Sequence, residues 1–339
     1  MTDSPFISII IPCRDEEPFI AKCLDSILAQ DYPSARMEVL IAEGMSSDRT
    51  RVILEDYSSL HPNIHWFENP AKITVAGLNL LIGRAKGEII LRMDAHSLFP
   101  REYVSKCVRY LNEYKVDNVG GVLETLPGAD TAVARAIALA LTSRFGVGGA
   151  AFRIGVSEPA IVDTVPFGCY RSGIFARIGL FNENLIRSED NEFNARLAKT
   201  GGKILLHPEI KCGYFARPDI PSIINQYFRN GFGCVYSAKF AESPFFLRHL
   251  APVGCLIFFA ACMLLGIWFK YLLWLGCGSL LLYIIGALAA SAILAVKYGW
   301  RHFLYLLIVF PVLHISYGIG SLWGICRLLL EGGRFRNSR

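Results

Sequence analysis

The sequence predicts an α/β domain with a mostly parallel sheet, followed by transmembrane helices. Over the first 249 residues, short strand-like runs alternate with helix-like runs, and three long apolar segments follow. The chain of 339 residues is 53% hydrophobic and 19% charged, and its mean hydropathy is +0.38. These values exclude a disordered chain, because such chains have low hydrophobicity and high charge.

The predicted strands are continuous apolar runs, which are typical of strands buried on both faces of a sheet. The first run is rich in isoleucine and ends at Pro12, and the fourth is followed by Asp94. The runs are Phe6–Ile11, Met37–Ala42, Ile64–Phe67 and Glu88–Met93.

Helical spacing of apolar residues separates these runs, as in Cys23, Leu24 and Ile27. The predicted helices are Pro18–Ala29, Asp48–Leu60, Thr74–Ala85 and Pro100–Tyr114. Strand and helix in alternation favour a parallel sheet with helices on both faces, which binds ligands at the carboxyl ends of its strands. The loops that begin at Pro12, Ala42 and Asp94 are therefore the expected site.

The C-terminal segments Leu250–Phe269, Tyr271–Val296 and Phe303–Cys326 are each long enough to cross a bilayer, which takes about 20 residues. Only Lys270 separates the first two, so we expect a helical hairpin. The third contains Pro311 and a Tyr317-Gly318-Ile319-Gly320 break, and it could span, kink or lie in the interface. We expect a cytosolic domain over residues 1–240 and a membrane region over residues 241–339.

The basic surplus of the chain lies in its apolar last third, which indicates membrane flanking and not nucleic-acid binding. Three spans would place the loop Lys297–His302 inside, as the positive-inside rule demands, but Arg334, Arg336 and Arg339 outside. The choice between two and three spans stays open. The first residues resemble no signal peptide, and the scattered cysteines suit a reducing compartment. We therefore expect a multi-pass protein of the inner (cell) membrane with a cytoplasmic catalytic domain.

Acidic side chains follow three of the predicted strands. They lie in Arg14-Asp15-Glu16-Glu17, in the segment from Glu43 to Asp48, and in Asp94-Ala95-His96. The glycine-rich motifs of dinucleotide-binding folds and P-loops are missing from the sequence. Acids at strand ends point instead to the hydroxyls of a sugar or nucleoside, or to a metal bound to phosphate.

Five segments in this order resemble the family 2 glycosyltransferases of GT-A fold. They are Ile9–Glu17, Ser26–Tyr32, Ala42–Thr50, Arg92–His96, and Ser188-Glu189-Asp190 followed by Arg196-Leu197 and Gly201. Asp-Ala-His, the glycine-rich stretch Phe145–Ala150 and the apolar C-terminus make the chain similar to the succinoglycan-biosynthesis ExoA branch. The resemblance covers roughly residues 6–240.

The resemblance implies a nucleotide-sugar donor held by the loops at Pro12, Asp15, Glu17, Glu43 and Asp48. Two positions depart from the family pattern: the usual Asp-Asp is Glu43-Gly44, and the second Asp of Asp-x-Asp is His96. A divalent metal, Mn²⁺ or Mg²⁺, is implied at Asp94. Imidazole can ligate Mn²⁺, whereas Mg²⁺ prefers oxygen. His96 could bind the metal, contact the diphosphate directly or only line the site.

The resemblance also makes Asp190 the general base and places Glu189 beside it, where it orients the acceptor or shifts the Asp190 pKa. Ser188 with the two acids also suits a plain helix start. Gln226 and Arg229 resemble the Gln-x-x-Arg segment of membrane glycosyltransferases and would hold the diphosphate, or Arg229 would face lipid headgroups.

The expected function is inverting transfer of a hexose from a nucleotide sugar, such as a UDP-hexose, to a lipid-linked or saccharide acceptor. The setting would be synthesis of exopolysaccharide or another surface glycan, with membrane lipid as a further partner and no nucleic acid. Two alternatives remain. One is a processive polysaccharide synthase, and the other is a non-catalytic membrane protein that senses nucleotide sugars.

Overall fold

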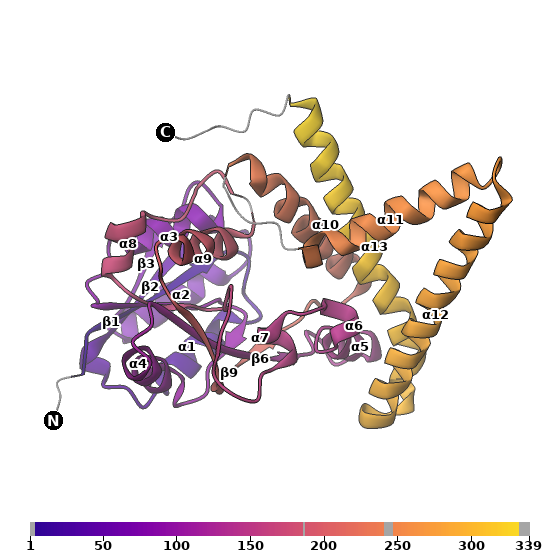
Figure 1. The fold of residues 1–339 in the computed structure, drawn as a ribbon. Helices are drawn as coiled ribbons and strands as arrows, with labels where there is room; N and C mark the ends of the chain where they lie inside the picture. The colour runs from indigo at the N-terminus through magenta and orange to yellow at the C-terminus, as the bar shows by residue number, and fades with distance from the viewer. Residues whose placement is uncertain (1–3, 186, 241–246, 332–339) are drawn as a thin grey trace. The chain divides into compact units, whose positions relative to one another are not determined.

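The computed structural model describes residues 4–185, 187–240 and 247–331 (Figure 1). The chain forms two compact units, each assembled from two separate stretches of sequence. Unit 1 combines residues 1–124 with residues 155–214, and unit 2 combines residues 125–154 with residues 215–339. The predicted boundary between residues 240 and 241 lies at the edge of a segment outside the described residues.

The first half of the unit 1 sheet is parallel, in the order β3-β2-β1-β4. These strands are Ile7–Cys13 (β1), Met37–Glu43 (β2), Ile64–Glu68 (β3) and Ile89–Arg92 (β4). β1 continues through Pro12, where the sequence predicts its end. Pro12 can stay in the strand because β4 pairs only with Ile7–Ile10, so at Pro12 the strand has β2 as its neighbour.

The second half of the sheet contains antiparallel pairs, so the sheet is mixed. β8 (Cys169–Arg171) pairs antiparallel with β4 and with β6 (Asn118–Leu126), and the order continues through β9 (Ile204–Phe215) to β5 (Ser97–Leu98). β7 (Ala160–Ile161) pairs antiparallel with β9. Antiparallel neighbours in this half replace the parallel pairs of the first half.

The helices of unit 1 follow the strands as the sequence predicts in its first half. α3 packs on β1 and β2, and α4 packs on β8. The helices are α1 (Ile20–Leu28), α2 (Thr50–Leu60), α3 (Thr74–Ile82), α4 (Tyr103–Glu113), α8 (Gly173–Ile178) and α9 (Glu189–Lys199), with a 3-10 turn η1 at Ser34–Arg36.

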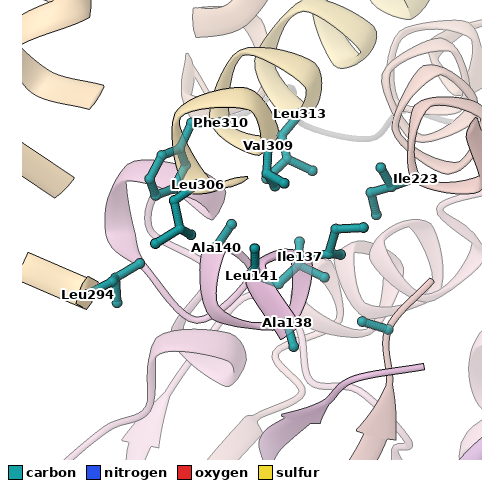
Figure 2. Packing of buried hydrophobic residues seen from close by; sticks show 12 residues of the cluster. Ile137, Ala138, Ala140, Leu141, Ile223, Leu294, Leu306, Val309, Phe310 and Leu313 are labelled. Atoms are coloured by element: carbon teal, nitrogen blue, oxygen red, sulfur yellow. The ribbon is translucent and has the colours of Figure 1, made fainter. Parts of the chain in front are cut away.

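Unit 2 is helical, and its core joins segments that are far apart in the sequence. Ile137 and Ala140 pack with Leu306, Val309 and Phe310 (Figure 2). Its helices are α5 (Ala132–Ala140), α6 (Arg144–Val147), α7 (Ala151–Ile154), α10 (Ile220–Tyr236), α11 (Leu247–Leu265), α12 (Lys270–Tyr298) and α13 (Phe303–Leu330), with 3-10 turns η2 (Ser237–Lys239) and η3 (Trp300–His302).

The predicted break at Tyr317–Gly320 is not a break, because α13 is continuous from Phe303 to Leu330. The glycines instead let α10 approach closely. A Cβ atom added to Gly320 would lie 2.0 Å from the carbonyl oxygen of Phe228, and one added to Gly231 would lie 2.0 Å from that of Tyr317. The Ser321 hydroxyl donates to the Gly231 carbonyl at 3.3 Å. Small residues thus fix the α10–α13 contact.

Two described helices, α12 and Trp300–Leu330, are long and apolar enough to cross a bilayer, and the apolar stretch His249–Leu265 is shorter. The expected hairpin is formed by α11 and α12, which pack together and meet near Lys270.

Candidate active site

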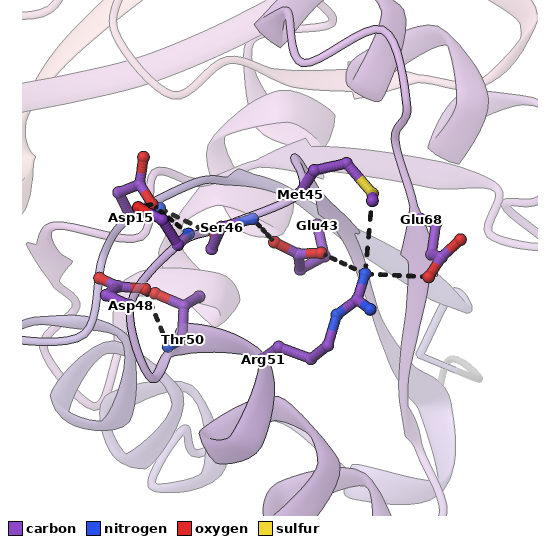
Figure 3. A network of polar contacts seen from close by, with 9 residues as sticks. Asp15, Glu43, Met45, Ser46, Asp48, Thr50, Arg51 and Glu68 are labelled. Carbon is purple, nitrogen blue, oxygen red and sulfur yellow. Dashed lines mark hydrogen bonds and ion pairs between the residues drawn. The ribbon is translucent and has the colours of Figure 1, made fainter.

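The predicted acidic loops meet at the carboxyl ends of β1 and β2, where hydrogen bonds join one loop to the other (Figure 3). The Asp15 carboxylate accepts from the Ser47 backbone amide at 2.7 Å, and the Asp15 amide donates to the Ser46 hydroxyl at 2.9 Å. Asp15 has φ 53°, in the left-handed region. The Asp15 carboxylate is half-exposed, and its hydrogen bonds hold it on the surface of a preformed loop.

A second set of bonds continues this connection. The Glu17 amide donates to Asp48 at 3.0 Å, and the Arg49 amide donates back to the Glu17 carboxylate at 3.1 Å. Asp48 also accepts from the Thr50 amide at 3.0 Å, where α2 begins. These amide bonds hold the pKa of Asp48 below its usual value despite its partial burial.

Glu43 is fully buried at the end of β2. Its carboxylate accepts from the Ser46 amide at 2.6 Å and from Arg51 at 3.0 Å, and Arg51 also pairs with Glu68 at 2.9 Å. These bonds lower the Glu43 pKa against the effect of burial. Glu43 thus shapes the loop, and its contact with a nucleotide stays a prediction. Pro12 lies half-buried beside it, opposite Ala42 in the sheet.

Arg92 forms the centre of the site. It is the last residue of β4, it is 5% exposed, and three carboxylates surround its guanidinium. One terminal nitrogen pairs with Asp190, and the other lies 3.1 Å from Glu189 and 3.5 Å from Asp94. The structure therefore unites Asp94 of the predicted donor motif with both residues of the predicted acceptor motif.

Asp190 stands in the first turn of α9, which begins at Glu189 as the sequence predicts. Ser188 has φ 66° and makes no capping hydrogen bond, so it does not act as the expected N-cap. Burial raises the pKa of Asp190 to about 7, Glu189 and Asp94 contribute to the rise, and Arg92 opposes it. A carboxylate with such a pKa suits general-base catalysis near neutral pH.

His96 is held by Glu16, a residue of the first loop. Its Nδ1 lies 3.0 Å from the Glu16 carboxylate, and its ring meets Tyr214 edge-on at 5.2 Å. Although burial lowers the His96 pKa, the bond to Glu16 raises it to about 9.

Glu16 holds Nδ1 of His96 as carboxylates hold metal-binding histidines, although a metal would have to displace the proton that the raised pKa leaves on the ring. Such histidines donate the N–H of one ring nitrogen to a carboxylate and bind through the other nitrogen, here Nε2. Asp94 supplies a carboxylate two residues away. Among the described residues, no group of three or more histidine, cysteine or acidic side chains is gathered around one ion position. A metal at Asp94 and His96 therefore stays a prediction.

Gln226 and Arg229 both lie on α10, which belongs to unit 2. Gln226 is half-buried, and Arg229 is exposed. Their predicted role toward the diphosphate stays a prediction.

Sequence reasoning passed over two residues of the site, Arg92 and Glu16. Arg92 ends the otherwise apolar run Ile89-Ile90-Leu91-Arg92. An arginine in a buried strand is almost always paired, so its position before Asp94 was a usable signal. Glu16 stands between two acids that the sequence singles out, and nothing local distinguishes its partner.

Comparison with known proteins agrees with this geometry. Residues 8–152 match the model of the family described as Glycosyl transferase family 2. The chain is 26% identical to the succinoglycan biosynthesis protein ExoA of Rhizobium meliloti, over 86% of this chain and 92% of the relative. It is 28% identical to a dolichyl N-acetyl-alpha-D-glucosaminyl phosphate 3-beta-D-2,3-diacetamido-2,3-dideoxy-beta-D-glucuronosyltransferase of Methanococcus voltae, over 77% of this chain and 82% of the relative.

Among solved structures, the mannosyltransferase PcManGT of Pyrobaculum calidifontis, in complex with GDP-Man and Mn²⁺, has the same fold. The TM-score is 0.60 at 19% identity, over 95% of this chain and 88% of that chain. The mixed sheet with its parallel half is the GT-A arrangement. The chain is therefore a glycosyltransferase of GT-A fold whose residues 8–152 match the family 2 model, and it is similar to ExoA.

Proposed function

We propose that the protein transfers a hexose from a nucleotide-sugar donor to the hydroxyl group of a lipid-linked or saccharide acceptor, with inversion at the anomeric carbon. One observation supports this most directly: Arg92 holds Asp94, Glu189 and Asp190 in a single cluster. Asp190, the proposed base for the acceptor, and Asp94, the carboxylate of the donor motif, thus lie close to each other. A single displacement requires such proximity of acceptor and donor.

Asp190 acts as the base and takes the proton of the acceptor hydroxyl as its oxygen attacks the anomeric carbon. Glu189 orients the acceptor, and its charge helps to keep the Asp190 pKa high. Arg92 keeps both carboxylates in place while the acceptor enters, and its charge limits the rise of the Asp190 pKa. Asp15, Glu17, Glu43 and Asp48, with Pro12, form the loops that receive the base, ribose and sugar.

Asp94 and His96 would hold a divalent metal, with His96 binding through Nε2 and Glu16 fixing its ring. When bound, that ion supplies positive charge beside the departing diphosphate. Gln226 and Arg229 are proposed, from their resemblance to the family segment, to bind phosphate oxygens.

Solved structures of similar fold contain different nucleotide sugars: GDP-Man in the PcManGT complex and UDP-GlcNAc in a complex of TarS of S. aureus. The donor here is proposed as UDP-glucose-like. The acceptor is proposed to be lipid-linked because the Methanococcus relative is named for a dolichyl phosphate substrate, and because two helices of this chain are long and apolar enough to cross a membrane.

A donor screen tests the proposal. Purified protein in detergent is offered a panel of UDP-, GDP- and dTDP-hexoses with lipid extract or free oligosaccharide, and release of nucleoside diphosphate is followed. Release that requires both donor and acceptor, and that Asp190→Asn slows by about 10²–10⁴, supports transfer. Binding of a nucleotide sugar without turnover on any acceptor would favour a sensor instead.

A further inference from the structure

We propose that α13 lies along the membrane surface without crossing it, and that the α11–α12 hairpin alone crosses. α13 then begins and ends on the side of the catalytic unit. The proposal does not depend on the reaction that the enzyme catalyses.

One face of α13 is an exposed apolar stripe that fits lipid. Its residues are each between 39% and 75% exposed and recur at helical spacing: Leu304, Ile308, Ile315, Ile319, Leu322 and Leu329. The opposite face is covered by protein, since α5 packs on the first half of the helix and α10 runs along the second.

The start of α13 is fixed on the catalytic side by α5. α5 packs against η3, the turn that leads into α13. It begins at Ala132, shortly after β6 ends at Leu126, whose carbonyl accepts from the Ala216 amide at 2.9 Å. The six residue steps from Leu126 to Ala132 reach at most about 21 Å, which is less than the hydrocarbon core of about 30 Å. α5, and therefore the start of α13, cannot lie across the bilayer.

The end of α13 is fixed by the segment that follows α10. Glu331, just after α13, pairs with Lys239 of η2, and the Tyr236 hydroxyl donates to the same carboxylate at 2.8 Å. α13 would therefore cross the bilayer only if α10 crossed beside it.

α10 is too polar to cross. Asn225 and Arg229 are both exposed on it. An arginine at the centre of a bilayer costs about 2.5–3.5 kcal/mol even on the most lenient scale. Both ends of α13 thus belong to one side of the membrane.

The hairpin completes the arrangement. α11 contacts α13 at Gly318, where an added Cβ would lie 3.1 Å from the Pro252 carbonyl, and α12 returns to the start of α13 (Figure 1). The turn between them carries exposed Trp268, Lys270 and Tyr271, which suit a far headgroup layer. This topology also keeps Arg334, Arg336 and Arg339 inside, which resolves the conflict that three spans create with the positive-inside rule.

Spin labels on the stripe test the proposal. Cysteine is placed singly at Ile308, Ile315 or Leu322 in the full chain with its native cysteines replaced, and the depth of each label is measured in liposomes from its collision with oxygen and with a water-soluble nickel complex. An in-plane helix gives three similar depths. A crossing helix gives a maximum at position 315, and that result would overturn the proposal.

A reporter fused after Arg339 provides the second measurement. Green fluorescent protein is expected to fluoresce there, and alkaline phosphatase is expected to be inactive. The matched fusion after Lys270 should show the reverse, because the hairpin turn lies outside. Active phosphatase at the C-terminus would mean that α13 crosses the membrane and that the proposal is wrong.

Discussion

The guanidinium of Arg92 forms an ion pair with the carboxylate of Asp190, while its second terminal nitrogen lies 3.1 Å from Glu189. The residue that ends a sheet strand therefore holds the proposed base at the first turn of α9. The position of the base and its pKa both depend on this one buried cation.

Asp190→Asn should lower the rate of transfer by about 10²–10⁴, the usual contribution of a general base. The amide keeps the shape of the carboxylate but cannot accept the proton, so donor affinity should hardly change. Rates and donor affinity are measured beside Asp56→Asn, a control in the exposed part of α2. Near-normal turnover of Asp190→Asn would reduce Asp190 to a structural residue of the helix start.

The rate of transfer should rise with pH and reach half its maximum at about pH 7, because the pKa of Asp190 is raised to about 7 and only the ionised form is a base. A raised carboxyl pKa stabilises the fold below the unfolded value of about 4, and this stability is lost as pH rises toward 7. A kcat profile from pH 5 to 9 checks the first statement. A profile flat between pH 5 and 8 would contradict it.

Arg92→Met should lower the free energy of unfolding by about 3–5 kcal/mol, because it leaves buried carboxylates without their cation. The loss should be larger at pH 8 than at pH 5, where Asp190 can take up a proton. Arg92→Lys keeps the charge but not the two-nitrogen fork, so it should recover most stability and only part of kcat. Thermal unfolding and kinetics of both variants, at both pH values, separate positioning from folding. Equal kcat in Arg92→Lys and the wild type would mean that the fork is dispensable.

Removal of divalent ions with EDTA should abolish transfer, and Mn²⁺ should restore it at least as well as Mg²⁺, because a nitrogen ligand suits the softer ion. His96→Asp should shift the preference toward Mg²⁺. Glu16→Gln should weaken Mn²⁺ binding by about 10–100-fold, as is usual when the partner of a metal-binding histidine is lost. Electron paramagnetic resonance of bound Mn²⁺ reports nitrogen coupling directly. The same coupling in His96→Asp as in the wild type would exclude His96 as a ligand.

Gly320→Ala should destabilise the protein, because its Cβ would meet the Phe228 carbonyl oxygen at 2.0 Å and push α10 from α13. Gly278→Ala on α12 is the matched control, since nothing lies within 4 Å of the Cβ that it adds. Thermal unfolding in detergent is compared for the two. Equal melting temperatures would show that the α10–α13 contact adapts without cost.

Long apolar runs made the first half of the fold predictable. The four parallel strands and their helices appear within a few residues of the expected positions. The antiparallel half escaped prediction. β5 and β7 have two residues and β8 has three, too few to show a period, while the longer β6 and β9 are interrupted by Gly120, Gly121 and Pro208. The glycines of α13 were misread for a different reason. Composition predicts a break there, but the α10 backbone that they accommodate comes from another part of the chain.

The candidate site also has a part that could be predicted from the sequence and a part that could not. Asp94, Glu189 and Asp190 could be found from sequence because their neighbours match a known pattern, and the structure brings them together. Their bonds to Arg92, and that between Glu16 and His96, depend on residues about 80 to 98 positions apart. Local sequence patterns do not indicate contacts between residues so far apart in the chain. The sheet order, which places β4 beside β1, brings His96 within reach of Glu16, whereas the position of α9 brings Glu189 and Asp190 to Arg92.

The contact between Phe145 and α13 has a consequence for biosynthesis. The Phe145 carbonyl accepts from His314 at 2.8 Å across a separation of 169 residues. At about 5–20 residues per second, a ribosome needs roughly 10–30 s to add that length. During this interval the apolar face of α5 has been made but its covering helix has not. The nascent chain must therefore be shielded by a chaperone, or held at the translocation machinery, until its last helix emerges.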